Sequence, residues 1–305
     1  MKRVFKNNAV STRENLISYS LIFPFLLIFC IFLLYPIIYS LILSFHKVTD
    51  LYDVFGSMKF VGSGNYIKLF KDVEFGWALL MTLYYAALSI PIGIALSFLL
   101  AVLTRGSIKG RNIFRTCFFL PFVLDVFVVA IVWTFLYSSP YGVVMRAFNF
   151  IGLKISPPLS TSSTAMPSIV IAMALKGAGF GMILFIAAMD NIPQSLFEAA
   201  SIDGASNFEK IKYITIPLIK PVILFLVIIG TIGALSAFAE FYGMTGGGPM
   251  VNFKGNTVGA TRVTGMYLYR NFESLKLGYA AAISFILLLI SMAISLVSLR
   301  LLREG

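Results

Sequence analysis

Residues 18–45 read SYSLIFPFLLIFCIFLLYPIIYSLILSF, and no side chain in this run carries a formal charge. A helix needs about 20 consecutive apolar residues to cross the hydrocarbon core of a bilayer, so the run predicts a membrane span. A second uncharged run, from Trp77 to Leu103, predicts another. Both runs also far exceed the apolar core of a signal peptide, so the first is predicted to be a retained span.

The composition of the whole chain agrees with several such spans. Of the 305 residues, 59% are hydrophobic and 12% are charged, compared with about 25% charged in a typical soluble domain. The mean hydropathy is +0.91. The net charge of +11 comes from basic residues in short loops between apolar runs, a pattern that favours membrane lipid over nucleic acid as the partner. A water-soluble fold is excluded.

Four further intervals hold at most one residue with a formal charge. Three have one each: Asp125 in 116–145, Lys176 in 155–189 and Glu240 in 221–253. The last, residues 277–299, has none. With one helix per interval, the sequence predicts an all-α integral membrane fold with six transmembrane helices over residues 18–305, preceded by a cytoplasmic N-terminal segment, 1–17. Strand-length alternation does not recur, so a membrane β-barrel is disfavoured.

Lysine and arginine set the expected orientation. If the N-terminus is cytoplasmic, basic residues are about twice as dense in the inner segments as in the outer ones. The clearest inner loop runs from Thr104 to Arg115 and contains no acid. A multi-pass protein of the cell membrane with both termini in the cytoplasm is therefore predicted.

The cytoplasmic segment 190–220, here called the elbow segment, is amphipathic and rich in helix signals. Pro193 suits the first turn of a helix and Gly204 suits its left-handed end. Ser206 followed by Glu209 forms a capping-box pattern that starts a second helix, which Pro217 is expected to stop. A helix, a glycine elbow and a helix are predicted, with apolar positions able to enter a partner's groove.

The elbow segment closely resembles the EAA loop of inner-membrane subunits of binding-protein-dependent ABC importers. The matching residues are Glu198-Ala199-Ala200, Gly204, Ile214, and Ile216-Pro217, where Ile216 replaces the family's usual Leu. The flanking residues resemble the carbohydrate-uptake branch, the maltose and glycerol-phosphate type. Other family motifs occur in order: Phe60-Val61-Gly62, Phe119-Leu120-Pro121, Gly179-Phe180, Gly247-Gly248-Pro249 and Gly278-Tyr279-Ala280.

This resemblance implies that the elbow segment is a coupling helix that fits a cleft on a cytoplasmic ATPase subunit. It places Glu198, Ala199, Ala200, Asp203, Gly204 and Phe208 at that contact, with Gly204 as the hinge. The implied partners are two ATPase subunits, a second homologous permease (a heterodimer) and an extracytoplasmic solute-binding protein. The implied cargo is a sugar, an oligosaccharide or a related polyol.

The chain is not expected to be an enzyme. It has no phosphate-binding G-x-x-x-x-G-K-[ST] motif, so ATP and Mg²⁺ are assigned to the partner ATPase subunits and no cofactor to this chain. Its one histidine, His46, leaves no catalytic triad and no metal site. An ion-coupled secondary carrier remains the alternative; it would show inverted repeats and broken helices.

Ionisable residues inside spans are costly in lipid, so Asp125, Lys176 and Glu240 are expected to face the protein interior. Lys176 and Glu240 form either a structural ion pair or part of a substrate pathway. The predicted pathway residues are Lys176, Gly177, Phe180, Phe238, Glu240 and Phe241, because sugars bind to aromatic faces and a few polar groups. The neighbouring glycines allow either close helix approach or room for a ligand.

By the same resemblance, the loop from Met244 to Gly278 faces outward, near the docking surface of the solute-binding protein. By the same resemblance, a few residues around 252–257 are extra relative to the family, and their role is left open between altering that docking and altering a scoop-like loop.

Overall fold

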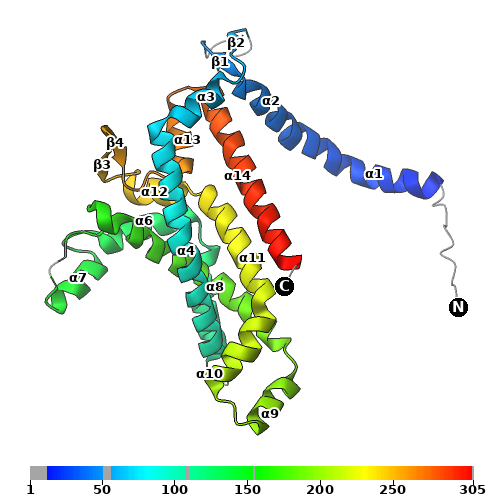
Figure 1. Cartoon of the computed structure of the whole chain (residues 1–305), viewed down its shortest axis with the longest axis vertical. Helices are drawn as coiled ribbons and strands as arrows, with labels where there is room; N and C mark the ends of the chain where they lie inside the picture. Colours follow the sequence, from blue (N-terminus) through cyan, green and yellow to red (C-terminus); the bar gives the residue numbers. More distant parts are fainter. Residues whose placement is uncertain (1–11, 51–55, 107–109, 154, 304–305) are drawn as a thin grey trace.

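Long helices dominate the molecule (Figure 1). The computed structural model describes residues 12–50, 56–106, 110–153 and 155–303. Within these ranges five helices are long and apolar enough to cross a membrane, and a sixth crossing exists if one bent helix pair counts as a single span. The predicted all-helical membrane fold is confirmed.

The first span is one continuous helix in three segments: α1 (Thr12–Phe29), the π-turn η1 (Cys30–Leu34) and α2 (Tyr35–Ser44). The π-turn ends just before Pro36, whose missing N–H interrupts regular helical bonding. Near the end of α2, Leu43 and Ser44 are buried, whereas the remainder of the helix projects away from the bundle (Figure 1). The helix begins within the predicted segment 1–17, of which residues 1–11 lie outside the described residues.

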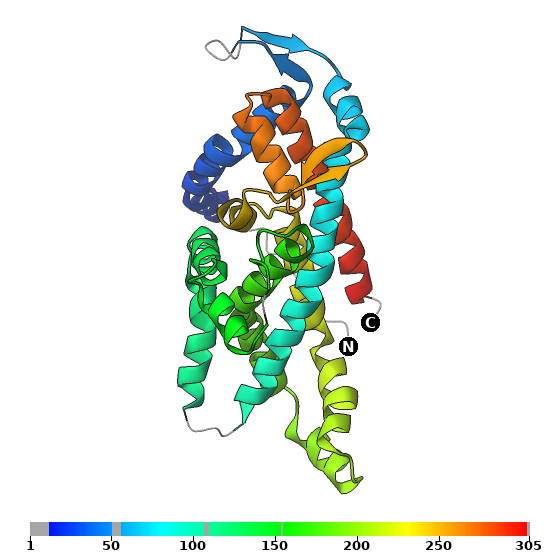
Figure 2. The ribbon, with the colours of Figure 1, turned by 90° about the vertical axis from the view of Figure 1, so that its left-hand side faces the viewer.

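Four long helices form the bundle: α4 (Val73–Arg105), α8 (Ser162–Asp190), α11 (Ile216–Leu235) and α14 (Leu277–Arg303). The pair α4 and α8 has the most extensive contact in the described chain. The tail of the bundle that carries α9 (Gln194–Ile202) and α10 (Asn207–Lys210) is called the elbow end. The opposite end, which carries the short strands, is called the ribbon end (Figure 2).

The prediction of one helix between Arg115 and Arg146 is wrong. The interval contains α5 (Arg111–Val123) and α6 (Val126–Tyr137), which meet at 105°, followed by α7 (Val143–Phe150). At the bend the side chain of Asp125 accepts the N–H groups of Phe127 and Val128 at 2.8 and 3.4 Å. The carboxylate thus caps α6, and Asp125 is exposed and not turned inward as predicted.

The interval from Lys220 to Lys254 also contains more than one helix. The span α11 ends at Leu235, and a separate short helix, α12 (Ala239–Thr245), begins after three non-helical residues. Phe238, with φ −148° and ψ −56°, precedes α12 directly. The backbone turns at this break, and as a result Phe238 and Glu240 line a space inside the bundle.

Two short antiparallel ribbons lie at the ribbon end of the described chain, and neither was predicted. The first pairs β1 (His46–Val48) with β2 (Met58–Phe60), and the second pairs β3 (Met250–Phe253) with β4 (Asn256–Gly259). Two helices accompany them: α3 (Gly64–Lys71) and α13 (Thr264–Glu273). The strands of the two ribbons are three or four residues long, too short for an alternation of apolar and polar residues to stand out in the sequence.

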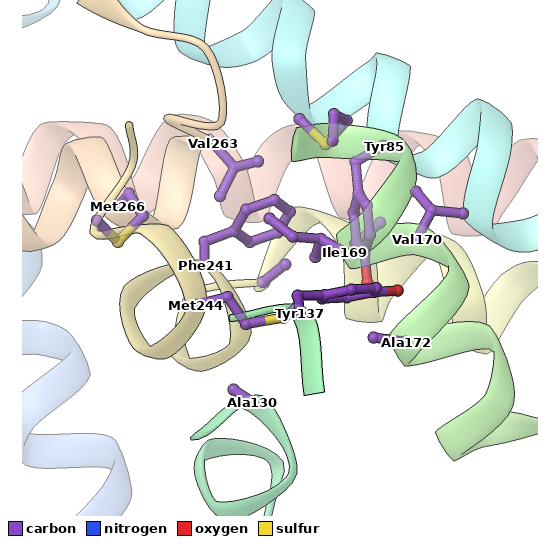
Figure 3. Packing of buried hydrophobic residues seen from close by; sticks show 13 residues of the cluster. Tyr85, Ala130, Tyr137, Ile169, Val170, Ala172, Phe241, Met244, Val263 and Met266 are labelled. Carbon is purple, nitrogen blue, oxygen red and sulfur yellow. The ribbon is translucent and has the colours of Figure 1, made fainter. Parts of the chain in front are cut away.

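The core is divided along the bundle. Toward the ribbon end, Tyr85, Phe241, Ile169 and Val263 pack with Met244 in one cluster (Figure 3). Toward the elbow end, a second cluster joins α4, α8 and α11 through side chains that include Phe185, Met182 and Ile219. The two clusters hold the same long helices at different levels, so α4 and α8 form one packed unit over most of their length.

Candidate functional site

The elbow segment has the predicted helix, elbow and helix. Gly204 has φ +79°, the left-handed conformation that follows a helix end. Its N–H donates to the carbonyl of Ser201 at 3.2 Å, and the N–H of Ala205 donates to the carbonyl of Ala200 at 2.8 Å. These two bonds form a Schellman motif that ends α9.

The second helix begins with the predicted capping box. The backbone N–H of Ser206 donates to Glu209 Oε2 at 2.7 Å, and the N–H of Glu209 donates to Ser206 Oγ at 3.3 Å. Two otherwise unpaired donors at the start of α10 are thereby satisfied. The chain direction at the elbow is therefore fixed by local bonds on both sides of Gly204.

Two details of the prediction are wrong. Pro193 is the N-cap of α9 and does not lie in its first turn. Pro217 does not stop the second helix, because the π-turn η2 (Ile211–Thr215) carries α10 directly into α11. The N–H of Ile216 bonds to the carbonyl of Ile211, so the helix changes register just before Pro217, whose ring then lies in the first turn of α11.

The six predicted contact residues lie on the surface of the elbow segment. Glu198, Ala199, Asp203, Gly204 and Phe208 are exposed, and Ala200 is half-buried. The tip also exposes large apolar side chains: Ile202 is 87% and Phe208 is 71% exposed. An ordered segment that presents bulky apolar side chains outward has the character of a docking surface.

The side of the elbow segment that faces the spans is apolar. Ile192 is buried, and Phe197 and Ile214 are half-buried against the cluster that joins α4, α8 and α11. The elbow segment and the bundle thus meet through packed apolar side chains.

A cavity of about 580 Å³ opens in the middle of the bundle. Its walls come from α4, α8, α11 and the break before α12, with Phe122 and Val126 from the bent pair. Four of the predicted pathway residues line it: Gly177, Phe180, Phe238 and Glu240. Phe180 stacks on Phe122 with ring centres 4.7 Å apart and planes at 13°.

Lys176 and Phe241 are predicted pathway residues that do not line this cavity. Lys176 points to α5, where its Nζ donates to the carbonyl of Phe122 at 3.2 Å and lies 5.4 Å from that ring centre. This carbonyl is among the last four of α5, which lack a helical partner. Phe241 is fully buried and packs edge-on against Tyr85 at 4.9 Å (Figure 3).

The ion pair between Lys176 and Glu240 is not formed. Among the described residues the ion pairs are Arg105–Asp190 and Arg262–Glu74. The hydroxyl of Tyr85, at the cavity wall, donates a long hydrogen bond of 3.4 Å to the carboxylate of Glu240. Glu240 is 9% exposed, so it is a buried acceptor with capacity left for a ligand hydroxyl.

The structure shows both uses predicted for the glycines, and Gly181 combines them because it also lines the cavity. A Cβ on Gly179 would overlap the carbonyl of Phe118, and one on Gly181 would overlap the side chain of Ser97, so both permit close helix approach. Gly177 and Gly233 have open space around them and line the cavity.

Sequence reasoning missed the contribution of α4 to the cavity. Tyr85, Ser89 and Ser97 line the wall, and all three lie on a span without charged residues. Polar residues spaced four and eight apart on an otherwise apolar run were the signal that could have found them.

The ribbon end is held together by polar contacts between segments far apart in the chain. Asp72 Oδ2 accepts the hydroxyls of Tyr267 and Tyr279 at 2.5 and 2.7 Å. Burial raises the pKa of Asp72, but these bonds and the backbone N–H groups of Glu74 and Phe75 outweigh burial and hold the pKa below its usual value. Together they fix α13 and α14 to the start of α4.

A second group of contacts fixes the β3–β4 ribbon. Arg262 pairs with Glu74 at 3.0 Å, and Trp77 Nε1 donates to the carbonyl of Gly259 at 2.8 Å. Burial lowers the pKa of Arg262, helped by Arg270 and opposed by Glu74. The residues 252–257, predicted to be extra relative to the family, form the tip of this ribbon, in which two strand pairs flank the turn at 254–255. Phe253 packs on Trp77 with ring centres 4.6 Å apart.

Taken together, these features define a multi-spanning membrane subunit with a central cavity and an ordered, exposed elbow at one end. Groups of three or more potential metal ligands are absent from the described residues.

Residues 89–303 match the family of binding-protein-dependent transport system inner membrane components, and the chain belongs to this family. It is thus a multi-pass inner-membrane permease of an ABC importer that depends on a binding protein, and it is not the ATPase. This membership replaces the alternative of an ion-coupled carrier.

Individual relatives span nearly the whole chain. The trehalose/maltose transport system permease protein MalF of Thermococcus litoralis is 30% identical over 289 residues, 94% of each protein. The lactose transport system permease protein LacF of Rhizobium radiobacter is 34% identical over 287 residues, 92% of each. A bacterial ABC transporter for import of the acidic polysaccharide alginate contains a chain with a TM-score of 0.80 and 25% identity, covering 96% of each chain.

Proposed function

We propose that the chain moves a saccharide or a related polyol through its central cavity as one half of a heterodimeric permease. The relatives named above carry trehalose and maltose, lactose, or alginate, which supports a carbohydrate cargo. Two cytoplasmic ATPase subunits bind ATP and Mg²⁺ and drive the cycle. Both termini and the elbow segment face the cytoplasm, and the ribbon end faces the solute-binding protein.

In this proposal the elbow segment docks into the ATPase. Glu198 and Asp203 supply polar contacts, Ala199 and Ala200 allow close approach, and Phe208 enters an apolar cleft. Gly204 sets the angle between α9 and α10. The observation that carries the proposal is the ordered elbow itself, closed by a Schellman motif and a capping box while Ile202 and Phe208 remain exposed.

The cavity provides the chemistry that a sugar requires. Phe180 and Phe238 offer ring faces for the apolar side of a pyranose, and Glu240 accepts hydrogen bonds from hydroxyls. Gly177 leaves room beside Phe180. Lys176 supports the wall by capping α5, and Phe241 supports it by packing behind Tyr85.

The test is transport by the assembled complex in proteoliposomes with its binding protein and ATPase subunits. We expect Glu198→Lys or Gly204→Pro to abolish uptake while the binding protein still captures its ligand. Lys210→Gln is the matched control, because Lys210 lies in the same segment and its ammonium hydrogen-bonds within that segment, to Ser201. Undiminished uptake by both the Glu198 and Gly204 variants would contradict the coupling role.

The cavity assignment has its own test. Glu240→Gln should reduce uptake at limiting cargo while leaving the copurified ATPase subunits in place, because a neutral amide is a weaker hydrogen-bond acceptor than a carboxylate. Equal uptake by wild type and variant at every cargo concentration would exclude Glu240 from the pathway.

A further inference from the structure

One arginine joins the ends of the two helices that wall the cavity. Arg105 is the last residue of α4, and Asp190 is the last residue of α8. Arg105 Nε lies 3.1 Å from Asp190 Oδ1, and its Nη2 donates to the carbonyl of Met189 at 2.8 Å. The guanidinium therefore binds a side chain and a main-chain carbonyl of α8 at the same time.

The same guanidinium also contacts the elbow segment. Its central carbon lies 5.8 Å from the ring centre of Phe197, within the range of a cation–π contact. In α9 only Phe197 and Ala200 are half-buried, and the remaining residues are exposed. Phe197 is therefore the main anchor of α9 on the bundle, and Arg105 lies against it.

Apart from the contact at Arg105, α4 and α8 are packed together along their length. Gly181 of α8 lies directly against Ser97 of α4, and Phe98 meets Phe185 edge-on at 5.6 Å. The same two helices supply much of the cavity wall, including Tyr85. A displacement of α9 that is passed to Arg105 consequently reaches the cavity through rigid helices.

Stability of the fold does not explain this arrangement. The side chains of Arg105 and Asp190 are 31% and 59% exposed, and ion pairs at such exposure contribute little to folding. The planar fork of arginine matters more, because it alone can serve Asp190, the Met189 carbonyl and an aromatic face together.

We propose that Arg105 is the positioning residue that transmits movement of α9 to the α4–α8 pair. This inference rests on the proposed coupling role of the elbow segment. Without the arginine fork, α9 would still dock on the ATPase, but Phe197 would slide over the end of α4 without moving the cavity walls. ATP would then be hydrolysed with less cargo moved.

The experiment measures cargo imported per ATP hydrolysed by the complete complex in proteoliposomes. Variants are Arg105→Gln, Arg105→Lys and Asp190→Asn. For Arg105→Gln we expect this ratio to fall about two- to thirtyfold, the span by which substitutions on a coupling route alter linkage between sites. For Arg105→Lys the ratio should fall less, because lysine keeps the charge but lacks the planar fork. For Asp190→Asn the ratio should also fall, because this variant weakens the same contact from the side of α8.

The matched control is Arg111→Gln. Arg111 is an exposed arginine at the start of α5, and no polar contact joins it to α8 or α9 in the described residues. Its ratio should equal that of wild type. Copurification of the ATPase subunits is measured for every variant and should be unchanged.

Three outcomes would overturn the proposal. One is an unchanged ratio for Arg105→Gln, and another is full loss of the ATPase subunits from that variant, since Arg105 would then serve assembly and not transmission. If Arg105→Gln does not accumulate, wild-type ratios for both Arg105→Lys and Asp190→Asn would be the third. A wild-type complex that imports cargo without any ATPase subunit would instead refute the proposed function itself, independently of Arg105.

Discussion

At the scale of single residues, backbone conformation decides the elbow. Gly204 adopts φ +79°, and a Cβ built at this position would meet no atom within 4 Å. The need for glycine is therefore conformational and not steric. A side chain with a Cβ costs about 1 kcal/mol in the left-handed region, and asparagine costs less than alanine.

This argument yields a graded prediction for Gly204. Gly204→Ala should destabilise the turn after α9 by about 1 kcal/mol, and Gly204→Asn by less. Faster hydrogen exchange of the amides in α9 would show the effect, with uptake decreasing in the same order. Equal exchange in the two variants would contradict the conformational explanation.

A second residue, Asp72, gives the ribbon end its dependence on pH. Its folded pKa lies below the unfolded value, because Tyr267, Tyr279 and two backbone N–H groups bind the charged form more than burial penalises it. The stabilisation is therefore present above the unfolded pKa and is lost as pH falls through the folded pKa.

Asp72→Asn should lower the thermal stability of the purified protein at pH 7 by about 2 kcal/mol, the usual value of hydrogen bonds to a charged group. The difference between wild type and variant should begin to shrink as pH falls below about 4, the ordinary pKa of an aspartate in the unfolded chain, and should vanish as pH falls through the lower folded pKa. Melting curves taken from pH 7 down to about 2, well below the ordinary aspartate pKa, measure it. A difference that stays constant across that range would refute the assignment.

At the scale of elements, a capping side chain can begin a new helix inside an interval that hydropathy alone predicts to be a single helix. The charge-poor interval 116–145 reads as one span, yet α5 and α6 meet at 105°. Asp125 accepts the first N–H groups of α6, so a new helix can begin at the bend. The break before α12 likewise places Phe238 and Glu240 at the cavity.

Asp125 can be tested with a pair of variants. Asp125→Ala should destabilise the protein by about 1 kcal/mol, whereas Asp125→Asn, which retains a capping oxygen, should be nearly neutral. Melting in detergent would measure both. If both variants melt equally far below the wild type, the charge of Asp125 and not its cap would be the important property; if both melt like the wild type, the cap contributes nothing.

At the scale of the whole molecule, close helix packing surrounds an open cavity. Gly179 lies against the backbone of α5 at Phe118, whereas Gly177, two residues earlier on α8, faces the cavity. Neighbouring glycines on one helix therefore serve different purposes. Which purpose each serves depends on the helix that lies opposite.

Gly179→Ala should force α5 away from α8 and destabilise the protein by about 1–3 kcal/mol, the usual cost of overpacking. Gly177→Ala should leave stability unchanged and reduce uptake by narrowing the cavity beside Phe180. Thermal melting and uptake, measured on both variants, would separate the two effects. Equal melting of the two variants would contradict the assigned packing.

The amino-acid sequence alone determined the membrane fold, the elbow with Gly204, and its capping box at Ser206. These features arise from local causes: uncharged length, backbone conformation and hydrogen bonds between near neighbours. The sequence also pointed to Glu240, because an ionisable residue inside a span is costly in lipid, and to Phe180, because an aromatic ring can bind the apolar face of a sugar.

Only the tertiary structure decided how these residues meet. It showed Lys176 capping α5 and not pairing with Glu240, and Phe241 buried in the core. It also carried the second helix of the elbow past Pro217 and brought Arg105 against Phe197. Most of these contacts join residues far apart in the chain, as Arg105 and Asp190 are 85 positions apart, so no local pattern of the sequence encodes them.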